Sequence, residues 1–249
     1  MDNNDQQLKK RLDELARKSY NQGIYLFTDF LSMPDAAIAC DSAPAGYVTL
    51  FGGTDGCERV MARFGNAEEF GYEEDFPIDV VMIEPLIKKF SDELTHRDFL
   101  GALMNLGIER SLLGDIIISD GAAYAFCLEK ISGYIMDNLT RVRNDYVRCT
   151  GNCVLDKDFS PSYKEITGSV ASLRLDAMIS LAFGESRSHS VSAIEGGLVF
   201  VNGKLITTNA YNLKEGEIIS VRGKGRFRYM YTKSETKKGR YMVVLNLYV

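Results

Sequence analysis

The chain has 249 residues, more than one minimal domain requires, so its length predicts about two domains. A composition of 45% hydrophobic and 25% charged residues is typical of a globular protein. No apolar run reaches the roughly 18 residues that a membrane helix needs, and the polar N-terminus lacks the apolar segment of a secretory signal. We therefore expect a cytoplasmic protein without a membrane partner.

The net charge of −5 hides two regions of opposite sign. From residue 164 onward, 13 Lys and Arg stand against 7 Asp and Glu, which leaves residues 1–163 at −11. A basic C-terminal third on an acidic body indicates a polyanionic partner at that end. Two solvated surfaces of opposite sign would give the same totals, so charge alone leaves both interpretations open.

Five scattered cysteines, an odd number, argue against a disulfide framework: Cys40, Cys57, Cys127, Cys149 and Cys153. Cys149 and Cys153 form the one close pair. With 2 His in the chain and no second pair of cysteines nearby, a zinc site has little support. We expect free structural thiols, no metal and no cofactor.

The first 75 residues predict a mixed, largely helical domain. Apolar spacing predicts an amphipathic helix over residues 8–20, and Ser32 or Asp35 can cap a second helix. Residues 46–51 have the composition of a strand, and residues 58–64 are expected to form a short helix.

Residues 76–155 predict a more regular domain. The expected elements are a strand at 78–83, a helix at 95–106, strands at 115–119 and 122–128 joined by an Asp120-Gly121 turn, a helix at 131–139 and a strand at 146–149. This β-α-β-β-α-β order is that of ferredoxin-like domains and of RNA-recognition motifs. The aromatic strand signature of those motifs is missing, so the topology supports RNA binding only weakly.

A polar segment with Pro161 and Gly168 predicts a linker over residues 156–169, where the charge balance also changes sign. Beyond it, an apolar stripe from Leu175 to Phe183 predicts a helix that Gly184 ends. Ser186 or Ser188 can cap a second helix, and strands at 198–201 and 217–221 should follow. The overall fold class is therefore α+β, with a small C-terminal domain over residues 170–249.

Four motifs of this last region carry a specific resemblance. They are Arg174-Leu-Asp, Ser186-Arg-Ser, Asn202-Gly-Lys and the Gly216-Glu-Ile-Ile-Ser-Val-Arg-Gly segment. In this order and spacing they resemble the S4 domain, in which two short helices on a small sheet present basic and hydroxyl side chains to structured RNA. The resemblance implies an RNA surface formed by Arg174, Ser186, Arg187, Ser188, Asn202, Lys204 and Arg222.

The chemistry of these residues suits phosphate binding. Arginine matches phosphate oxygens bidentately, and serine hydroxyls add further phosphate contacts. We expect Asp176 to orient an arginine, because a carboxylate repels phosphate.

The C-terminal tail extends the basic region. Between Arg222 and Arg240 lie eight basic residues and one acid, Glu235. Lys224, Arg226 and Arg228 join the predicted RNA-binding set on this ground. The interleaved Phe227, Tyr229 and Tyr231 would stack on unpaired bases. A terminal hairpin that turns at Lys238-Gly239 is compatible with this interpretation.

A second resemblance covers nearly the whole chain. The Thr-His-Arg-Asp-Phe-Leu-Gly-Ala block at residues 95–102, with an N-terminal helical segment and a C-terminal S4 domain, resembles the bacterial YlmH family. Its members are RNA-binding proteins of the large ribosomal subunit, linked to rescue of stalled subunits carrying peptidyl-tRNA, with an older naming tied to cell division. The resemblance implies rRNA, tRNA and the ribosome as partners, and no DNA.

In that block, His96 and Arg97 are expected either to cap a helix or to make additional RNA contacts. The His96-Arg97-Asp98 sequence is also found in kinase catalytic loops, but the chain has neither a glycine-rich nucleotide loop nor an Asp-Phe-Gly motif.

Two other functions stay open. S4 modules accompany pseudouridine synthases and a tRNA synthetase, so the acidic body could modify RNA. A pseudouridine synthase needs a Gly-Arg-Leu-Asp-like motif, however, and neither Arg11-Leu-Asp nor Arg174-Leu-Asp follows a glycine. A scaffold for division proteins is a third interpretation. We predict a non-enzymatic RNA-binding protein and assign no catalytic residue.

Overall fold

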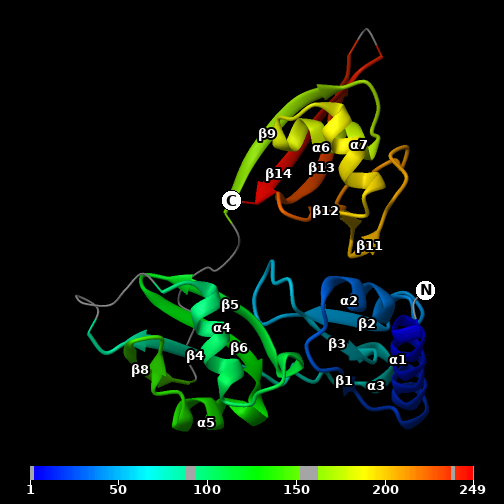
Figure 1. Cartoon of the computed structure of the whole chain (residues 1–249). Helices are drawn as coiled ribbons and strands as arrows, with labels where there is room; N and C mark the ends of the chain where they lie inside the picture. Colours follow the sequence, from blue (N-terminus) through cyan, green and yellow to red (C-terminus); the bar gives the residue numbers. More distant parts are fainter. Residues whose placement is uncertain (1–2, 88–93, 152–161, 237–238, 249) are drawn as a thin grey trace. The chain divides into compact units, whose positions relative to one another are not determined.

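A computed structural model describes residues 3–87, 94–151, 162–236 and 239–248 (Figure 1). The chain divides into two compact units, Met1–Ser160 and Pro161–Val249. Both units combine helices with antiparallel sheets, so the predicted α+β class is confirmed. Among the described helices, none has the length and apolar composition that a membrane crossing requires.

The first unit begins with a long amphipathic helix that packs on a small sheet. The elements are α1 (Asn3–Gln22), β1 (Leu26–Phe27), α2 (Met33–Cys40), β2 (Val48–Phe51), β3 (Met61–Phe64) and α3 (Ala67–Phe70). The strands form a sheet in the order β1-β3-β2. Leu12 and Ala16 of α1 and Phe64 of β3 are buried in one core. Ser32 caps α2 by accepting a hydrogen bond from the Asp35 amide, as one of the two predicted caps.

The predicted helix over residues 58–64 is wrong. Residues Met61–Phe64 form β3, which pairs with β1 on one side and β2 on the other. All four residues are buried. A short segment buried on both faces has no alternating pattern, and its length does not distinguish a strand from one turn of helix. Pairing with two neighbouring strands decides the conformation here.

The second half of this unit has the predicted β-α-β-β-α-β order. Its elements are β4 (Ile78–Pro85), α4 (His96–Asn105), the 3₁₀ helix η2 (Arg110–Leu112), β5 (Leu113–Ser119), β6 (Ala122–Leu128), α5 (Glu129–Asn138), β7 (Arg141–Val142) and β8 (Asp145–Thr150). The sheet order is β5-β6-β4-β8-β7 with antiparallel neighbours, as in ferredoxin-like domains. Asp120 and Gly121 both have positive φ, 52° and 75°, as the predicted two-residue hairpin requires.

The two faces of this sheet bury different partners. Val81, Ile83 and Ala125 point toward α4 and α5 and form one core with them. Phe126 and Leu128 point the other way and pack with Phe30 and Met61 of the N-terminal segment. RNA-recognition motifs use the sheet face opposite the helices to stack bases. In this chain, the N-terminal segment occupies part of that face.

A polar clamp reinforces the same contact. The half-buried Arg59 guanidinium donates to the backbone carbonyls of Phe30, Arg110 and Leu113 at 2.8, 3.2 and 2.9 Å. The Asp115 carboxylate accepts from the backbone amide of Arg59 at 3.3 Å. Burial lowers the pKa of Arg59 against the opposing effect of Asp115. Residues 1–75 and 76–155 thus each have a core of their own, share a third cluster around Phe126, and belong to one compact unit.

The second unit is a six-stranded sheet with two helices on one face (Figure 1). Its elements are β9 (Tyr163–Val170), α6 (Leu175–Phe183), α7 (Arg187–Glu195), β10 (Val199–Val201), β11 (Lys204–Leu205), β12 (Ile218–Val221), β13 (Gly225–Glu235) and β14 (Tyr241–Tyr248). The strand order is β11-β10-β12-β13-β14-β9. Leu175, Met178 and Ile179 of α6 pack against Phe227 and Leu245 of the sheet. Of the predicted Lys238-Gly239 turn, Lys238 lies outside the described residues.

The predicted linker over residues 156–169 is wrong from residue 163 onward. Residues 156–161 lie outside the described residues, whereas Tyr163–Val170 form β9, which pairs with β14 along its whole length. Only one face of this edge strand reaches the core, so every second residue is polar. Gly168 lies directly under Leu181, where a Cβ would be 2.3 Å from a Leu181 methyl group. The glycine marks close packing of α6 on the strand.

We expect Phe126→Ala to destabilise the first unit strongly, because Phe126 is fully buried where the N-terminal segment meets the middle sheet. Loss of a buried phenyl ring costs about 3–5 kcal/mol. Urea unfolding followed by circular dichroism measures the change. Ile118→Ala on the neighbouring strand is the control, since Ile118 is 41% exposed and its truncation should cost less than about 0.5 kcal/mol. Equal effects of the two variants would contradict this account of the contact.

Candidate RNA-binding surface

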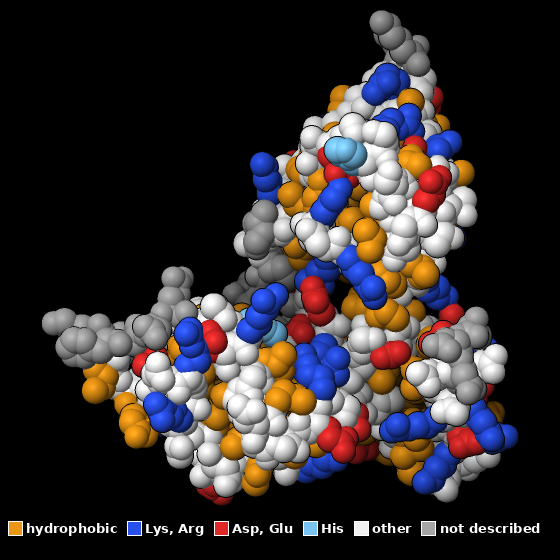
Figure 2. Space-filling model, viewed as in Figure 1, with side chains coloured by type: hydrophobic (Ala, Val, Ile, Leu, Met, Phe, Trp, Pro, Cys, Tyr) orange, Lys and Arg blue, Asp and Glu red, His pale blue; other side chains and the backbone are white. Residues whose placement is uncertain are grey.

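The C-terminal unit carries the excess of positive charge. Lys and Arg side chains are spread over its visible face, with few carboxylates among them (Figure 2). The predicted RNA-binding residues of this unit do not form one surface, however. The structure separates them into a cluster at the ends of the two helices, a hairpin, and the opposite face of the sheet.

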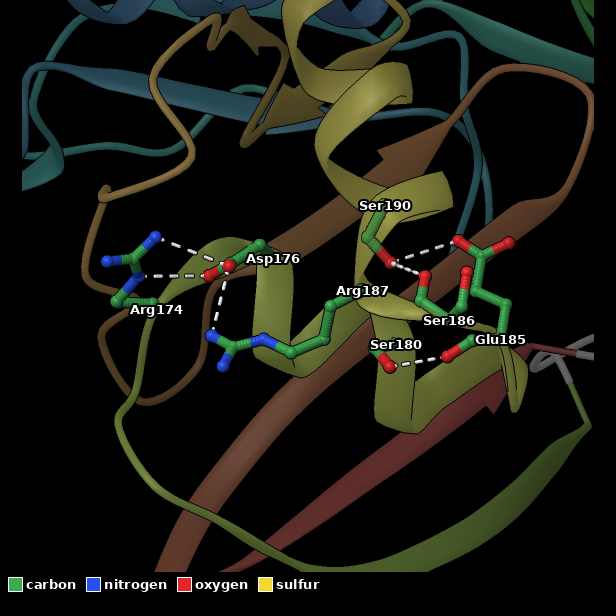
Figure 3. A network of polar contacts seen from close by, with 7 residues as sticks. All are labelled: Arg174, Asp176, Ser180, Glu185, Ser186, Arg187 and Ser190. Atoms are coloured by element: carbon green, nitrogen blue, oxygen red, sulfur yellow. Dashed lines mark hydrogen bonds and ion pairs between the residues drawn. The ribbon is translucent and has the colours of Figure 1, made fainter.

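The cluster at the helix ends is organised by one buried carboxylate. The Asp176 side chain is 5% exposed and binds two arginines (Figure 3). Arg174 donates from Nε and Nη2 to its two oxygens at 3.0 and 3.3 Å. Arg187 donates from Nη2 to Oδ2 at 3.0 Å. Asp176 therefore orients both guanidinium groups, which extends the prediction that it orients one arginine.

The backbone explains why these three residues meet. Arg174 is the N-cap of α6, and the loop that precedes it is held by Leu175 N–Tyr211 O and Leu213 N–Leu173 O hydrogen bonds of 2.8 and 2.9 Å. Gly184 ends α6 with a φ of 64°, a conformation that glycine adopts without strain. The chain then turns into α7, so that Arg187 at its first position faces Asp176.

The serines of the Ser-Arg-Ser motif stabilise the same turn. Ser186 is the N-cap of α7 and accepts a hydrogen bond from the His189 amide at 3.4 Å. Its hydroxyl lies 2.9 Å from that of Ser188. Both serines are exposed, so their oxygens can also contact a ligand at the start of the helix, where backbone amides favour anions.

Lys224 has a partner in this region. Its ammonium group pairs with the Glu185 carboxylate, which also accepts from the Ser190 hydroxyl at 3.1 Å. Partial burial raises the pKa of Glu185, but the hydrogen bonds from Lys224 and Ser190 outweigh burial and hold the pKa below its ordinary value. Glu185 is therefore ionised at neutral pH, and it neutralises part of the positive charge that Lys224 contributes.

Asn202 and Lys204 lie on the hairpin between β10 and β11. Asn202 and Gly203 have φ values of 47° and 78°, which confirms the predicted two-residue turn. The Asn202 side chain is engaged, because its Oδ1 accepts from the Ile218 amide at 2.9 Å. Asn202 thus holds the hairpin to β12, and the exposed Lys204 follows it on β11.

Arg222, Arg226 and Arg228 lie on the face of the sheet that the helices leave uncovered. On β13, Phe227 and Tyr229 point into the core and are 0% and 1% exposed, so the arginines between them point the other way. The prediction that Phe227 and Tyr229 stack on bases is therefore wrong. Alternation along the strand assigns the rings to the core and the arginines to the opposite face.

His96 and Arg97 begin α4 in the other unit. They follow Thr95, whose amide and hydroxyl donate to the Asp98 carboxylate at 2.8 and 2.7 Å. Both are exposed, and Arg97 borders a cavity of about 510 Å³ that Asp98 and Arg143 also line. Their predicted role as RNA contacts remains a proposal.

The described residues contain no cluster of three or more His, Cys, Asp or Glu that could hold a metal ion. Burial raises the pKa of Cys127 to about 12 and that of Cys149 to about 11, so neither thiol is ionised at neutral pH. Cys127 and Cys149 carry free thiols, and Cys153 lies outside the described residues.

Three aromatic residues were not predicted as part of a site. Phe200, Tyr163 and Tyr248 lie on the uncovered sheet face, where the Arg222 guanidinium is 4.9 Å from the Phe200 ring and that of Arg226 is 4.6 Å from the Tyr248 ring. The alternation of Val199 and Val201 around Phe200 could have indicated its orientation. Tyr163 lies in the predicted linker. Its position on this face follows only from the register of β9 against β14, which the sequence does not give.

Comparisons with known proteins match a family to each of the two units. A family described as a putative RNA-binding domain in YlmH matches residues 72–154, and the S4 domain family matches residues 173–219. The chain is 30% identical over 221 residues to "Ribosome-associated protein quality control protein P2" of Bacillus subtilis, covering 87% of this chain and 84% of that protein. A solved structure of "Cell division protein ylmH from Streptococcus pneumoniae" superposes with a TM-score of 0.50 at 20% identity, covering 63% of this chain and 96% of that one.

We expect Asp176→Asn to weaken RNA binding although it removes a negative charge. Simple electrostatics predicts tighter binding, whereas loss of the shared carboxylate releases two guanidinium groups that must then be ordered on binding. An affinity loss of about five-fold or more follows from immobilising two long side chains. Fluorescence anisotropy with a labelled RNA hairpin measures the effect. The control is Glu195→Gln on α7, an exposed acid whose loss should leave affinity unchanged or raise it. Tighter binding by both variants would refute the orienting role.

Proposed function

This chain belongs to the YlmH family of S4-domain proteins, and from that premise we propose that it binds rRNA of the large ribosomal subunit together with tRNA. In this role it would act in quality control of stalled peptidyl-tRNA complexes. The observation that carries the proposal is the pair of guanidinium groups fixed on the buried Asp176 carboxylate.

The geometry of this pair suits the backbone of structured RNA. The Arg174 and Arg187 side chains are 38% and 54% exposed although each donates to Asp176, so their remaining N–H groups can reach a ligand. A guanidinium has five donors in a planar fork and matches phosphate oxygens bidentately. Arginines that are already oriented lose less side-chain entropy when they bind, which favours a defined phosphate geometry over a flexible polyanion.

The ribosome as partner rests on the relative. The Bacillus subtilis protein is described by name as ribosome-associated and as a quality control protein, and it aligns with most of this chain. The family matches support RNA as the ligand. The putative RNA-binding domain lies in the first unit of the chain and the S4 domain in the second. A ribosomal partner also implies a cytoplasmic location.

We propose that the protein acts by binding and not by catalysis. The polar cluster of the C-terminal unit consists of arginines that carboxylates orient and partly neutralise, together with serines that cap α7, and such a set is suited to holding anions. In the described part of the chain, the buried thiols are protonated and no metal-ligand cluster is present.

Replacing Arg174 and Arg187 together with Gln should weaken binding to structured RNA and flatten its salt dependence. A glutamine amide can still donate to Asp176, so the buried carboxylate keeps partners. Each phosphate contact contributes roughly 0.7–0.9 to the slope of log affinity against log salt, so the double variant should lose about 1.5 units. Titrations at several salt concentrations give the slope. Arg11→Gln with Arg17→Gln on α1 is the matched control, because it removes the same charge from exposed positions.

Sedimentation of the tagged full-length protein through a sucrose gradient tests the ribosomal partner. We expect migration with free large subunits, crosslinks to tRNA and rRNA, and loss of both in the Arg174 and Arg187 double variant. If the protein stays at the top of the gradient but binds hairpin RNA with full affinity, it binds RNA without binding the ribosome. That result would reject the ribosome as partner.

A further inference from the structure

We infer that the helix-free face of the C-terminal sheet is a second RNA site, which takes unpaired nucleotides of a single-stranded segment. The inference rests on the proposed RNA-binding function but concerns a different surface. In this inference, bases stack on rings of the sheet face that the helices do not cover. Phe227 and Tyr229 cannot take this role, because they are buried in the core.

Strand register defines this face. Phe200 of β10 pairs with Ser220 of β12, which pairs with Arg226 of β13. Register partners share a face, and the flanking Val199, Val201, Ile219, Val221 and Phe227 all belong to the core under the helices. The row continues onto β14. Because Phe227 pairs with Leu247 in antiparallel strands, the preceding Arg226 lies beside the following Tyr248. Tyr248 in turn pairs with Tyr163 of β9.

The face therefore combines aromatic rings with arginines. Tyr163 and Tyr248 are in edge contact, with ring centroids 5.0 Å apart. Arg226 covers the Tyr248 ring, and at the other end of the row Arg222 covers the Phe200 ring. Between β10 and β14 lie three strand spacings, about 14 Å, a distance that a few nucleotides can span. Rings at both ends of the row provide stacking positions for two separated bases.

The rings are accessible enough to receive bases. Tyr163 is 42% exposed, and Phe200 and Tyr248 are partly exposed. Tyr231 is 46% exposed and pairs with Val244, which does not belong to the core under the helices, so its ring adds to the same face. Bases stack both on aromatic rings and on arginine guanidinium planes, so each ring with its arginine offers a stacking surface.

Charge favours a nucleic acid over a neutral partner. Strand register and ring contacts place Arg222, Arg226 and Arg228 on this face. Among the described strand residues, Glu165 is the one acidic residue that the register places on the same face. Burial raises the pKa of Tyr248 while Arg228 and Arg226 lower it, so the hydroxyl stays neutral at physiological pH and does not repel phosphate. Aromatic rings interleaved with arginines are the composition of single-strand binding surfaces.

The first site has a different chemistry. At the helix ends, arginines are fixed by a carboxylate and flanked by serines, and no aromatic contact involving them is present in the described residues. Such a set holds phosphates in a fixed geometry. The sheet face offers stacking, which requires bases that are not already paired. The two surfaces should therefore differ in their preference for paired and unpaired RNA.

The test uses the full-length chain with Phe200, Tyr163 and Tyr248 replaced by Leu, which keeps apolar volume but removes the rings. Binding is measured to a labelled uridine 12-mer and to a blunt RNA hairpin without unpaired ends. We expect the triple variant to lose about ten-fold or more in affinity for the 12-mer, because it removes three rings on which bases can stack, and to bind the hairpin like wild type. Tyr20→Leu on α1, with an exposed ring in the acidic unit, is the control.

The double Gln variant of Arg174 and Arg187 distinguishes this inference from the proposed function. If the double variant loses hairpin binding and the triple Leu variant binds the 12-mer like wild type, the proposed function stands and the second site is rejected. If the triple variant loses both RNAs equally while its circular dichroism spectrum is unchanged, the face belongs to one common site and the inference is also rejected. Ultraviolet crosslinks from a 4-thiouridine 12-mer to peptides containing Phe200 or Tyr248 would support it directly.

Discussion

The site at the helix ends depends on one buried carboxylate. Asp176 lies at the start of α6 with a side chain 5% exposed, a position where an unpaired charge would be very unfavourable. Its two arginine partners are what make burial tolerable, and in return the carboxylate fixes both guanidinium groups. The requirement to pair Asp176 couples the end of the loop before α6 to the start of α7. The fold of the helical pair and the orientation of the two guanidinium groups proposed to bind RNA therefore depend on the same contact.

The sheet under α6 and α7 separates Arg174 and Arg187 from the basic residues on its opposite face. Alternation along β13 sends Phe227 and Tyr229 under the helices, so Arg226 and Arg228 must point to the opposite face. A single stretch of basic and aromatic residues therefore serves two surfaces. The buried rings stabilise the unit, and two of its arginines, Arg222 and Arg226, contact other rings, Phe200 and Tyr248, from strands distant in the sequence.

Patterns confined to neighbouring residues were predictable from sequence, and patterns that depend on pairing were not. The α6 stripe, the Ser32 cap and the turns at Asp120 and Asn202 follow from local chemistry, and the structure has all of them. β3 was mistaken for a helix because burial on both faces erases alternation. β9 was mistaken for a linker because an edge strand under a helix contains polar residues and glycine. For Asp176, the sequence predicted that it orients one arginine. It did not predict the second partner, Arg187, which lies eleven positions away.

The middle sheet of the first unit has part of its helix-free face covered by the N-terminal segment, which leaves less of that face for RNA. Phe126 and Leu128 lie on the side where an RNA-recognition motif would stack bases, and here they pack against Phe30 and Met61. Residues 1–163 also carry a charge of −11, which repels RNA over about a Debye length, near 8 Å at physiological salt. If this unit contacts RNA, the charge favours a local cationic position, and Arg97 and Arg143 around the α4 cavity offer one. The C-terminal unit, at +6, supplies the long-range attraction, so it should determine where RNA first binds.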